Sequence, residues 1–413
     1  MGILTRSTII FIIVISVIIR VVLSFLPSFE IDESAYRYFS SKLVSARLDK
    51  FYTSENFNSN SIGFLYPLWI IGLIKESFFP SLDFFSRNYD LLLKIPALIT
   101  DTLSSVVIYY LIRKKWGERW GVLGFLLYMF NPAIVFNTSV WGQYDSISTF
   151  FLLLSLLSII NRKAILMSLF FAIALSLKPQ AIFFSPIAII LTLKNTKPST
   201  WLLSFFVFLL SNLVIYIPFF PKNPILGIYL VNSKLAGTYI CTSCFAFNFW
   251  GIFGNWRDDL HLFLSISKVY WGMILPIIYL AVLFLIKPIR IKFQFPYIFL
   301  TTALCVMAFY TLLTRMHERY LFAFFPFLLL GALLLKSKIL TFFYILTSTL
   351  HFLNLYFVYS YFNVIYAHSQ SIFFNSFLYQ FLDTNFNYLS ILSTLFFFCI
   401  TFISVKFVYD KNR

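Results

Sequence analysis

Long apolar runs separated by short polar segments make up most of the chain. Many of these runs are close to 20 residues, the length that an α-helix needs to cross about 30 Å of hydrocarbon. The single-residue alternation of apolar and polar positions that marks the strands of a membrane β-barrel is not seen. The pattern therefore predicts an all-α, polytopic helical membrane protein.

About 12 of the runs are expected to span the membrane. The first, from Ser7 to Leu26, lacks a small-residue cleavage site before Pro27, so we interpret it as a retained span and not as a signal peptide. The others are expected near residues 92–112, 120–138, 146–161, 163–178, 180–194, 200–218, 265–286, 294–313, 320–336, 338–359 and 387–406. With no internal repeat or low-complexity linker, residues 1–413 are predicted to form a single transmembrane domain.

Composition and charge agree with this interpretation. The chain is 60% hydrophobic and 12% charged, whereas soluble domains are roughly 25% charged. The 32 Lys and Arg exceed the 16 Asp and Glu, but they gather between spans and do not form a surface for nucleic acid. The positive-inside rule predicts that these clusters face the cytoplasm. They are Arg113–Lys115, Arg162–Lys163, Lys194 with Lys197, Lys287–Lys292, Lys336 with Lys338, and Lys406–Arg413.

Keeping every basic cluster inside constrains the topology. The apolar stretch from Ile62 to Leu73 is about 12 residues, short for a span. We expect it to be an amphipathic or re-entrant segment within a long first outer loop, residues 27–91. A second outer loop is expected at residues 219–262. Both termini are then predicted to be cytoplasmic.

A polar motif, WGQYD at residues 141–145, lies at the outer seam between two predicted spans. Amide and carboxylate groups at this depth can hydrogen-bond the hydroxyls of a sugar, and aromatic rings can cover its apolar face. We predict that the motif binds the sugar or the acceptor through Trp141, Gln143, Tyr144 and Asp145. The alternative is a loop that is polar only because the helix breaks at Asn131-Pro132.

Carboxylates open the first outer loop, in the sequence FEIDE. A base that activates a hydroxyl must be a positioned carboxylate or imidazole, and Asp32 has the right depth to meet a lipid-bound substrate. The alternative is an acidic helix start, in which Asp32 or Glu33 interacts favourably with the positive end of the helix dipole.

Cations stand at two predicted outer helix ends. Lys178, in the sequence LKPQ, is a candidate for binding a phosphate, although a lysine that simply reaches the interface predicts the same residue. Gln180 of the same sequence is predicted to bind the sugar or the acceptor. In the sequence MHERY, Arg319 can hold two phosphate oxygens and His317 can donate to a third. A structural ion-pair network is the alternative for this turn.

Two charges are expected inside the membrane, Arg20 and Asp101, and intramembrane charges are usually paired. We expect them to pair with each other, or Asp101 to pair with Lys94. In the second outer loop, Cys241 and Cys244 form a lone CxxC, for which a disulfide is favoured over a zinc site.

Read in order after the acidic first loop, WGQYD, LKPQ and MHERY resemble the polytopic GT-C glycosyltransferases. The resemblance covers about Arg20 to Tyr320 and is closest to mannosyltransferase-like membrane proteins of archaea and bacteria. It extends more distantly to the dolichyl-phosphate-sugar-dependent mannosyl- and glucosyltransferases. It implies transfer of a hexose, mannose or glucose, from a polyprenyl- or dolichyl-phosphate carrier to a lipid-linked or other glycan acceptor at the outer face. The base that it implies is Asp32, with Glu33 as the rival.

A lipid phosphate leaves as a stable anion, so a single carboxylate base and a cationic clamp suffice for an inverting single displacement. No cofactor is expected, although a divalent metal held by Asp32 and Asp145 would also fit the carboxylates. The competing prediction is a transporter or flippase of lipid-linked sugars, which would be expected to show repeated halves.

Overall fold

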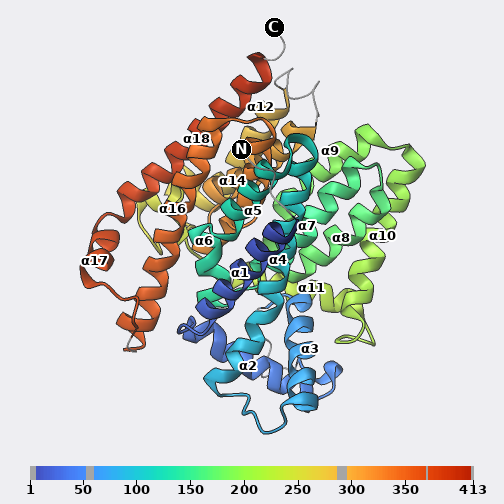
Figure 1. The fold of residues 1–413 in the computed structure, drawn as a ribbon, viewed down its shortest axis with the longest axis vertical. Coiled ribbons are helices and arrows are strands. Elements are labelled where there is room, and N and C mark those ends of the chain that lie inside the picture. Colours follow the sequence, from blue (N-terminus) through green and yellow to red (C-terminus); the bar gives the residue numbers. More distant parts are fainter. Residues whose placement is uncertain (1–5, 53–59, 286–294, 369–370, 411–413) are drawn as a thin grey trace. The chain divides into compact units, whose positions relative to one another are not determined.

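Helices account for 79% of the computed structural model (Figure 1), which describes residues 6–52, 60–285, 295–368 and 371–410. The prediction of an all-α helical membrane protein is confirmed at this level. The basic cluster predicted at Lys287–Lys292 lies outside the described residues, as does the tail beyond residue 410.

Seven helices in the described part of the chain are long and apolar enough to cross a membrane. They are α1 (Arg6–Ser24), α4 (Arg87–Trp116), α10 (Pro198–Tyr216), α12 (Lys268–Leu285), α14 (Phe295–Leu312), α16 (Lys338–Ser360) with its π-helical extension η6 (Tyr361–Tyr366), and α18 (Phe386–Asp410). The number rises to eight if α5 (Glu118–Met129) and the segment Pro132–Trp141, which meet at a bend of 49°, count as one broken span. The predicted number of about 12 is not confirmed.

The predicted and observed numbers of spans differ because four of the predicted spans form short helices. α7 (Asp145–Ile160), α8 (Ala164–Leu177) and α9 (Ser185–Asn195) have 16, 14 and 11 residues, and α15 (Phe324–Leu334) has 11. At 1.5 Å per residue the longest of these covers about 24 Å, less than the roughly 30 Å of the hydrocarbon core. The predicted ends of α7 and α8 lie within a residue or two of the observed ones, so the number of spans differs because these helices are short and not because their ends were misplaced.

The chain forms two compact units, each assembled from separate stretches of sequence. Unit 1 comprises Met1–Arg20, Thr102–Asn137 and Tyr239–Arg413, and unit 2 comprises Val21–Asp101 and Thr138–Thr238. The further elements of unit 2 are α2 (Glu30–Ser45), η1 (Leu48–Lys50), α3 (Ile62–Phe78), η3 (Pro179–Phe184) and α11 (Pro224–Gly237). Those of unit 1 are α6 (Pro132–Val135), β1 (Ser243–Cys244), η4 (Phe249–Phe253), β2 (Leu262–Phe263), β3 (Ile266–Ser267), β4 (Met316–His317), η5 (Glu318–Leu321) and α17 (Ser376–Thr384).

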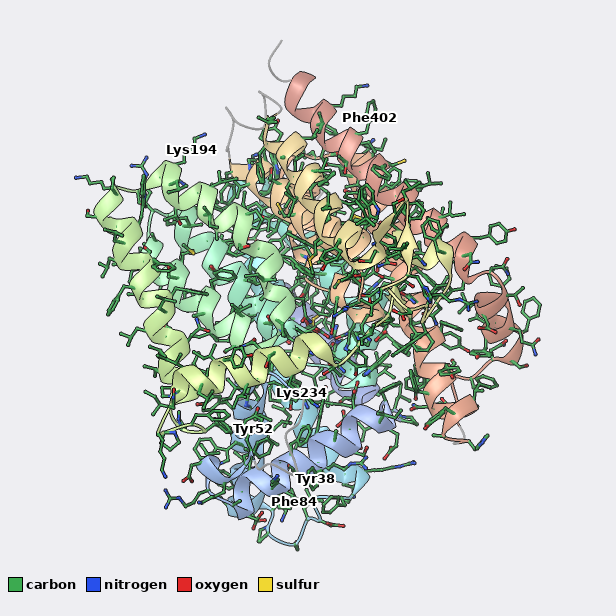
Figure 2. The ribbon with its side chains drawn as sticks, turned by 180° about the vertical axis from the view of Figure 1, so that it is seen from behind. Tyr38, Tyr52, Phe84, Lys194, Lys234 and Phe402 are labelled. Atoms are coloured by element: carbon green, nitrogen blue, oxygen red, sulfur yellow. A yellow bond between two sulfur atoms is a disulfide. The ribbon has the colours of Figure 1, made fainter. Side chains whose placement is uncertain are left out.

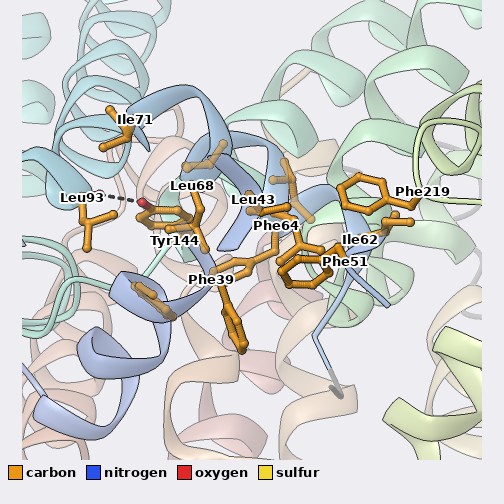
Figure 3. Close-up of a cluster of buried hydrophobic side chains, with 14 of the residues drawn as sticks. Phe39, Leu43, Phe51, Ile62, Phe64, Leu68, Ile71, Leu93, Tyr144 and Phe219 are labelled. Atoms are coloured by element: carbon orange, nitrogen blue, oxygen red, sulfur yellow. Dashed lines mark hydrogen bonds between the residues drawn. The ribbon is translucent and has the colours of Figure 1, made fainter. Parts of the chain in front are cut away.

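Unit 2 is built around a cluster of buried aromatic and aliphatic side chains (Figure 3). Helix α2 packs on α3, and α8 packs on α3, α7 and α10. The cluster includes Phe39, Phe51, Phe64 and Phe219. Aromatic rings bury large apolar areas, so this core fixes α2 and α3 firmly against the rest of the unit.

The end of α9 and the first-loop residues lie at opposite ends of unit 2. Lys194, at the end of α9, lies at one end of the unit, and the first-loop residues Tyr38 and Phe84 lie at the other (Figure 2).

In unit 1, α14 and α15 pack together and are almost completely buried. Other helices of the unit expose apolar side chains, such as Phe402 on α18, which is 71% exposed (Figure 2). Exposed apolar side chains on long helices are what a lipid environment favours. Two short pairs of strands complete the unit: β1 with β4 in parallel, and β2 with β3 in an antiparallel hairpin.

The buried charges each find polar partners. Arg20 donates from Nη1 to the carbonyl oxygen of Met129 at 2.9 Å. Asp101 accepts from the hydroxyl of Thr138 at 2.7 Å. The ammonium of Lys94, predicted as an alternative partner of Asp101, instead donates to the carbonyl oxygen of Ser24 at 2.9 Å.

Candidate active site

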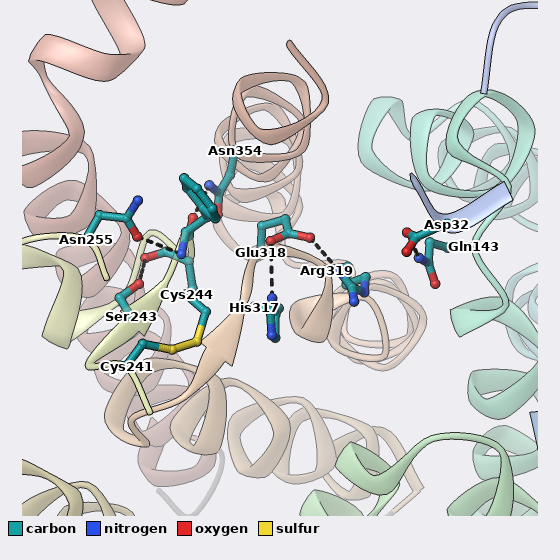
Figure 4. A network of polar contacts seen from close by, with 12 residues as sticks. Asp32, Gln143, Cys241, Ser243, Cys244, Asn255, His317, Glu318, Arg319 and Asn354 are labelled. Carbon is teal, nitrogen blue, oxygen red and sulfur yellow. Dashed lines mark hydrogen bonds and ion pairs between the residues drawn. A yellow bond between two sulfur atoms is a disulfide. The ribbon is translucent and has the colours of Figure 1, made fainter. Parts of the chain in front are cut away.

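Asp32 lies in the first turn of α2, at the centre of a hydrogen-bonded group of predicted site residues. Its Oδ2 accepts a hydrogen bond from the indole Nε1 of Trp141 at 2.8 Å. The same oxygen accepts another from the amide Nε2 of Gln143 (Figure 4). The side chain remains partly exposed. Asp32 is therefore held in one orientation while part of it stays open to a ligand.

The WGQYD segment is fastened to the start of α2. The ring of Phe29 stacks on Trp141 with centroids 4.3 Å apart, and the amide of Phe29 donates to the carbonyl oxygen of Trp141 at 3.4 Å. Before it, the chain runs through the π-helical turn η2 (Phe136–Trp141). π-Helical turns are uncommon in proteins, and those that occur often lie at functional sites. The turn redirects the chain so that Trp141 and Gln143 face α2.

Gly142 is needed at the tightest point of this segment. Its φ of +93° is one that residues with side chains rarely adopt. A Cβ atom at this position would also overlap Oε1 of Glu33 and lie 3.0 Å from its Cδ. Backbone conformation and contact with α2 therefore both require glycine.

Lys178 connects Gln143 to Asp145. It follows the last residue of α8, in extended backbone before Pro179. Its Nζ donates to Oε1 of Gln143 at 2.9 Å and lies 3.5 Å from Oδ1 of Asp145. Its positive charge is thus held between an amide and a buried carboxylate, which orients both.

Gln180 completes the group, since its Nε2 donates to Oδ1 of Asp145 at 3.3 Å. The structure therefore joins residues from three distant stretches of sequence into one polar group, which we call the Asp32 network: Asp32, Trp141, Gln143, Asp145, Lys178 and Gln180. Tyr144 of the same motif points away from it, because its hydroxyl donates to the carbonyl oxygen of Leu93 at 2.7 Å and its ring lies in the apolar core (Figure 3).

Glu33 differs sharply from its neighbour Asp32. Its side chain is fully buried, and neither carboxyl oxygen has a hydrogen-bond partner among the described residues. Burial, followed by the negative charge of Asp90, raises the pKa of Glu33 well above its usual value, against the opposing charges of Lys94 and Arg37. Of these two neighbouring carboxyl groups, only that of Asp32 is therefore accessible to a ligand.

Arg37 and Asp90 are important charged residues of this region that the sequence analysis missed. Arg37 donates from Nε and Nη2 to the two carboxylate oxygens of Asp90, both at 2.6 Å, and from Nη1 to Glu30 at 3.0 Å. The hydrogen bonds to Asp90 are the main cause of the raised pKa of the Arg37 guanidinium. This paired contact joins α2 to α4, one helical turn after Glu33 along α2. In the sequence they are two single charges, 53 residues apart within the predicted first outer loop, and nothing in the pattern pairs them.

His317 and Arg319 belong to unit 1, where they flank a buried carboxylate, Glu318. Arg319 donates from Nη1 to Oε1 of Glu318 at 2.8 Å, and Nδ1 of His317 lies 3.9 Å from the other carboxylate oxygen (Figure 4). The ring of Tyr239 meets that of His317 edge-on, with centroids 4.5 Å apart. The turn therefore places the guanidinium of Arg319 and the imidazole of His317 beside the carboxylate of Glu318.

The backbone that carries His317 is held by the CxxC segment. Strand β1 pairs with β4 so that Cys244 lies opposite His317, and a disulfide joins Cys241 to Cys244 (Figure 4). The amide of Arg315 donates to the carbonyl oxygen of Cys241 at 3.0 Å, and its Nε donates to Asp259 at 2.6 Å. The second outer loop thus supports the MHERY turn.

Within the described residues, no group of three or more His, Cys, Asp or Glu side chains is arranged to hold a metal ion. The two carboxylates considered for a metal each have another contact. Asp32 accepts from Trp141 and Gln143, and Asp145 faces the ammonium of Lys178.

Comparison of the chain with known proteins found no matching family model and no similar curated protein.

Proposed function

We propose that the protein is a membrane glycosyltransferase that moves a hexose from a polyprenyl-phosphate carrier to a glycan or lipid-linked acceptor at the outer face of the membrane. The observation that carries the proposal is the Asp32 network, in which a partly exposed carboxylate is oriented by an indole and an amide. A carboxylate held in this way, with one side open, meets the geometric requirement for a general base.

In the proposed reaction, Asp32 accepts the proton of the acceptor hydroxyl while that oxygen attacks the anomeric carbon of the donor sugar. The bond between the anomeric carbon and the phosphate oxygen breaks, and the polyprenyl phosphate leaves with the bonding electrons. Attack opposite the leaving group inverts the anomeric configuration. The leaving phosphate needs charge stabilisation and no proton.

Cations supply that stabilisation in the proposal. Arg319 and His317 are the proposed phosphate ligands, because a guanidinium can donate to two phosphate oxygens at once. Lys178 is proposed to contribute its charge while keeping Gln143 and Asp145 in place, in keeping with its contacts to both.

The amides of Gln143 and Gln180 and the carboxylate of Asp145 are proposed to bind sugar or acceptor hydroxyls. Trp141 and Tyr144 are completely buried. We therefore propose that these two residues support the Asp32 network and do not contact the sugar, with Trp141 orienting Asp32.

The proposal can be tested with purified protein in vesicles that contain mannosyl or glucosyl polyprenyl phosphate and a lipid-linked glycan acceptor. Mass spectrometry is expected to show acceptors enlarged by one hexose, together with free polyprenyl phosphate in equal amount. Movement of the intact sugar lipid across the bilayer without release of polyprenyl phosphate would instead support a flippase. A comparison of lipid-linked glycans in cells with and without the protein would identify the sugar and the acceptor.

A further inference from the structure

A cluster of exposed cations surrounds two tryptophans in unit 1, where α4 ends and α15 meets α16. We call it the basic tryptophan surface. Its cations are Arg113, Lys114, Lys115, Arg119, Lys336 and Lys338, and all six are exposed. Its aromatic residues are Trp116 and Trp120, and its acidic residue is Glu118.

The surface is formed by two segments that are distant in sequence and held together by hydrogen bonds. The end of α4 caps the end of α15. Lys115 donates from Nζ to the carbonyl oxygen of Leu334 at 3.0 Å, and Trp116 donates from Nε1 to the same oxygen at 3.2 Å. These bonds satisfy a helix-terminal carbonyl that would otherwise need water, and they fix the indole of Trp116 next to the turn after α15.

Lys336 follows α15 in a left-handed conformation, with φ of +51°. This turn brings its ammonium 3.8 Å from the ring centroid of Trp116 and 5.2 Å from that of Trp120. A cation over an indole face is attracted by the ring quadrupole. Lys336 is thus held over the indoles while its residue as a whole remains exposed.

The charge of the surface is strongly unbalanced. Its carboxylate, Glu118, is engaged by Arg113 at 2.5 Å and by the hydroxyl of Tyr109 at 2.5 Å. Lys114, Lys336 and Lys338 are exposed and add positive charge that this one carboxylate does not balance. General topology rules explain why basic residues end a span, but they do not require ammonium groups to be ordered over indoles.

We infer that the basic tryptophan surface binds the headgroup of an anionic phospholipid on the face predicted to be cytoplasmic. Trp116 ends the candidate span Arg87–Trp116, so the surface lies at the depth of the headgroups if that helix crosses the bilayer. Indoles favour that depth, and clustered Lys and Arg attract anionic lipid there. The phosphodiester is expected beside the ammonium of Lys336, with the glycerol part against the indoles; Lys114, at the same helix end, adds to the positive charge of the surface. This inference is independent of the proposed glycosyl transfer.

Native mass spectrometry of the full chain, released from nanodiscs of phosphatidylcholine and phosphatidylglycerol, tests the inference. The test variant carries Lys114→Gln and Lys336→Gln. The matched control carries Lys194→Gln and Lys197→Gln, which removes equal charge from exposed positions at another basic helix end. We expect the test variant to bind phosphatidylglycerol about 30-fold more weakly, because each basic residue near a charged bilayer contributes to affinity, and the control to bind nearly as the wild type does.

Equal losses in the two variants would overturn the inference, since they would show attraction by net charge alone. So would undiminished phosphatidylglycerol binding in the test variant. Lys114→Gln alone provides a second check, because Lys114 is exposed and is the member of the pair that is not stacked on an indole. It is expected to weaken binding about fivefold while leaving the thermal stability in pure phosphatidylcholine unchanged. Inorganic phosphate at millimolar concentration should not displace the lipid; if it does, the surface is a general phosphate site.

Discussion

Replacing Gly142 by alanine tests whether the WGQYD segment is fixed against α2 as the structure indicates. Two separate costs act at this position. The φ of +93° disfavours any residue with a side chain, at about 1–3 kcal/mol. The new methyl group would also overlap Oε1 of Glu33 and lie 3.4 Å from Cε of Lys94.

Gly117 offers a matched control, because its φ of +83° is similar but no atom lies within 4 Å of the place a Cβ would occupy. Gly117→Ala therefore carries only the backbone cost. Gly142→Ala must in addition displace a fully buried carboxyl group, and overpacking of this kind costs about 1–3 kcal/mol. We expect Gly142→Ala to lower the free energy of unfolding by about 2–6 kcal/mol, and Gly117→Ala by less.

Equilibrium unfolding in mixed micelles measures both variants. A double variant with Glu33→Ala removes the group that the methyl would strike, so the additional loss in Gly142→Ala should largely disappear in that background. Displacing this segment should also lower the proposed transfer rate, because shifts near 1 Å at a site can cost about 100-fold. Equal losses in Gly142→Ala and Gly117→Ala, with no rescue by Glu33→Ala, would refute the contact between Gly142 and Glu33.

Two further predictions concern the charges beside this segment. The raised pKa of Glu33 means that the native state holds its proton above pH 4.5, where the unfolded chain releases it. The free energy of unfolding should therefore fall as pH rises through that window, by up to about 1.4 kcal/mol per pH unit for one proton. Glu33→Gln should remove this slope in unfolding curves recorded from pH 5 to 8; an unchanged slope would show that another group causes it. Arg37→Gln leaves the carboxylate of Asp90 buried without its guanidinium, at a cost of about 3–5 kcal/mol, whereas Arg47→Gln, at a side chain that is 83% exposed, should cost less than about 1 kcal/mol. Similar unfolding midpoints for these two arginine variants would contradict the structural importance of the Arg37 pair.

The sequence was enough to predict a helical membrane protein, because runs of apolar residues with few charges have few other stable solutions. It was not enough to count the spans. The ends of α7 and α8, at Asn161 and Lys178, were predicted closely, but apolar composition did not show that helices of 16 and 14 residues are too short to count as full spans. Short helices inside a bundle are as apolar as long ones when other helices cover them.

The candidate site was predictable to a similar extent. Asp32, Gln143 and Lys178 stood out as polar residues at predicted outer helix ends, and the structure brings them into contact. What the sequence could not separate was Asp32 from Glu33, since adjacent residues on a helix face different surroundings only after tertiary packing. The sequence also could not show that the Tyr144 side chain lies in the apolar core, because a tyrosine suits both an apolar core and a sugar site.

The central claim is that Asp32 is the base of a glycosyl transfer, and the transfer rate of Asp32→Asn measures it most directly. Asparagine nearly preserves the size of the side chain but cannot take a proton. With purified protein, a polyprenyl-phosphate hexose and a saturating acceptor, we predict a fall in kcat of about 100-fold or more. Donor binding should change little, and Glu33→Gln should keep most of the activity. Near-normal transfer by Asp32→Asn, or a comparable loss in Glu33→Gln alone, would contradict the assignment.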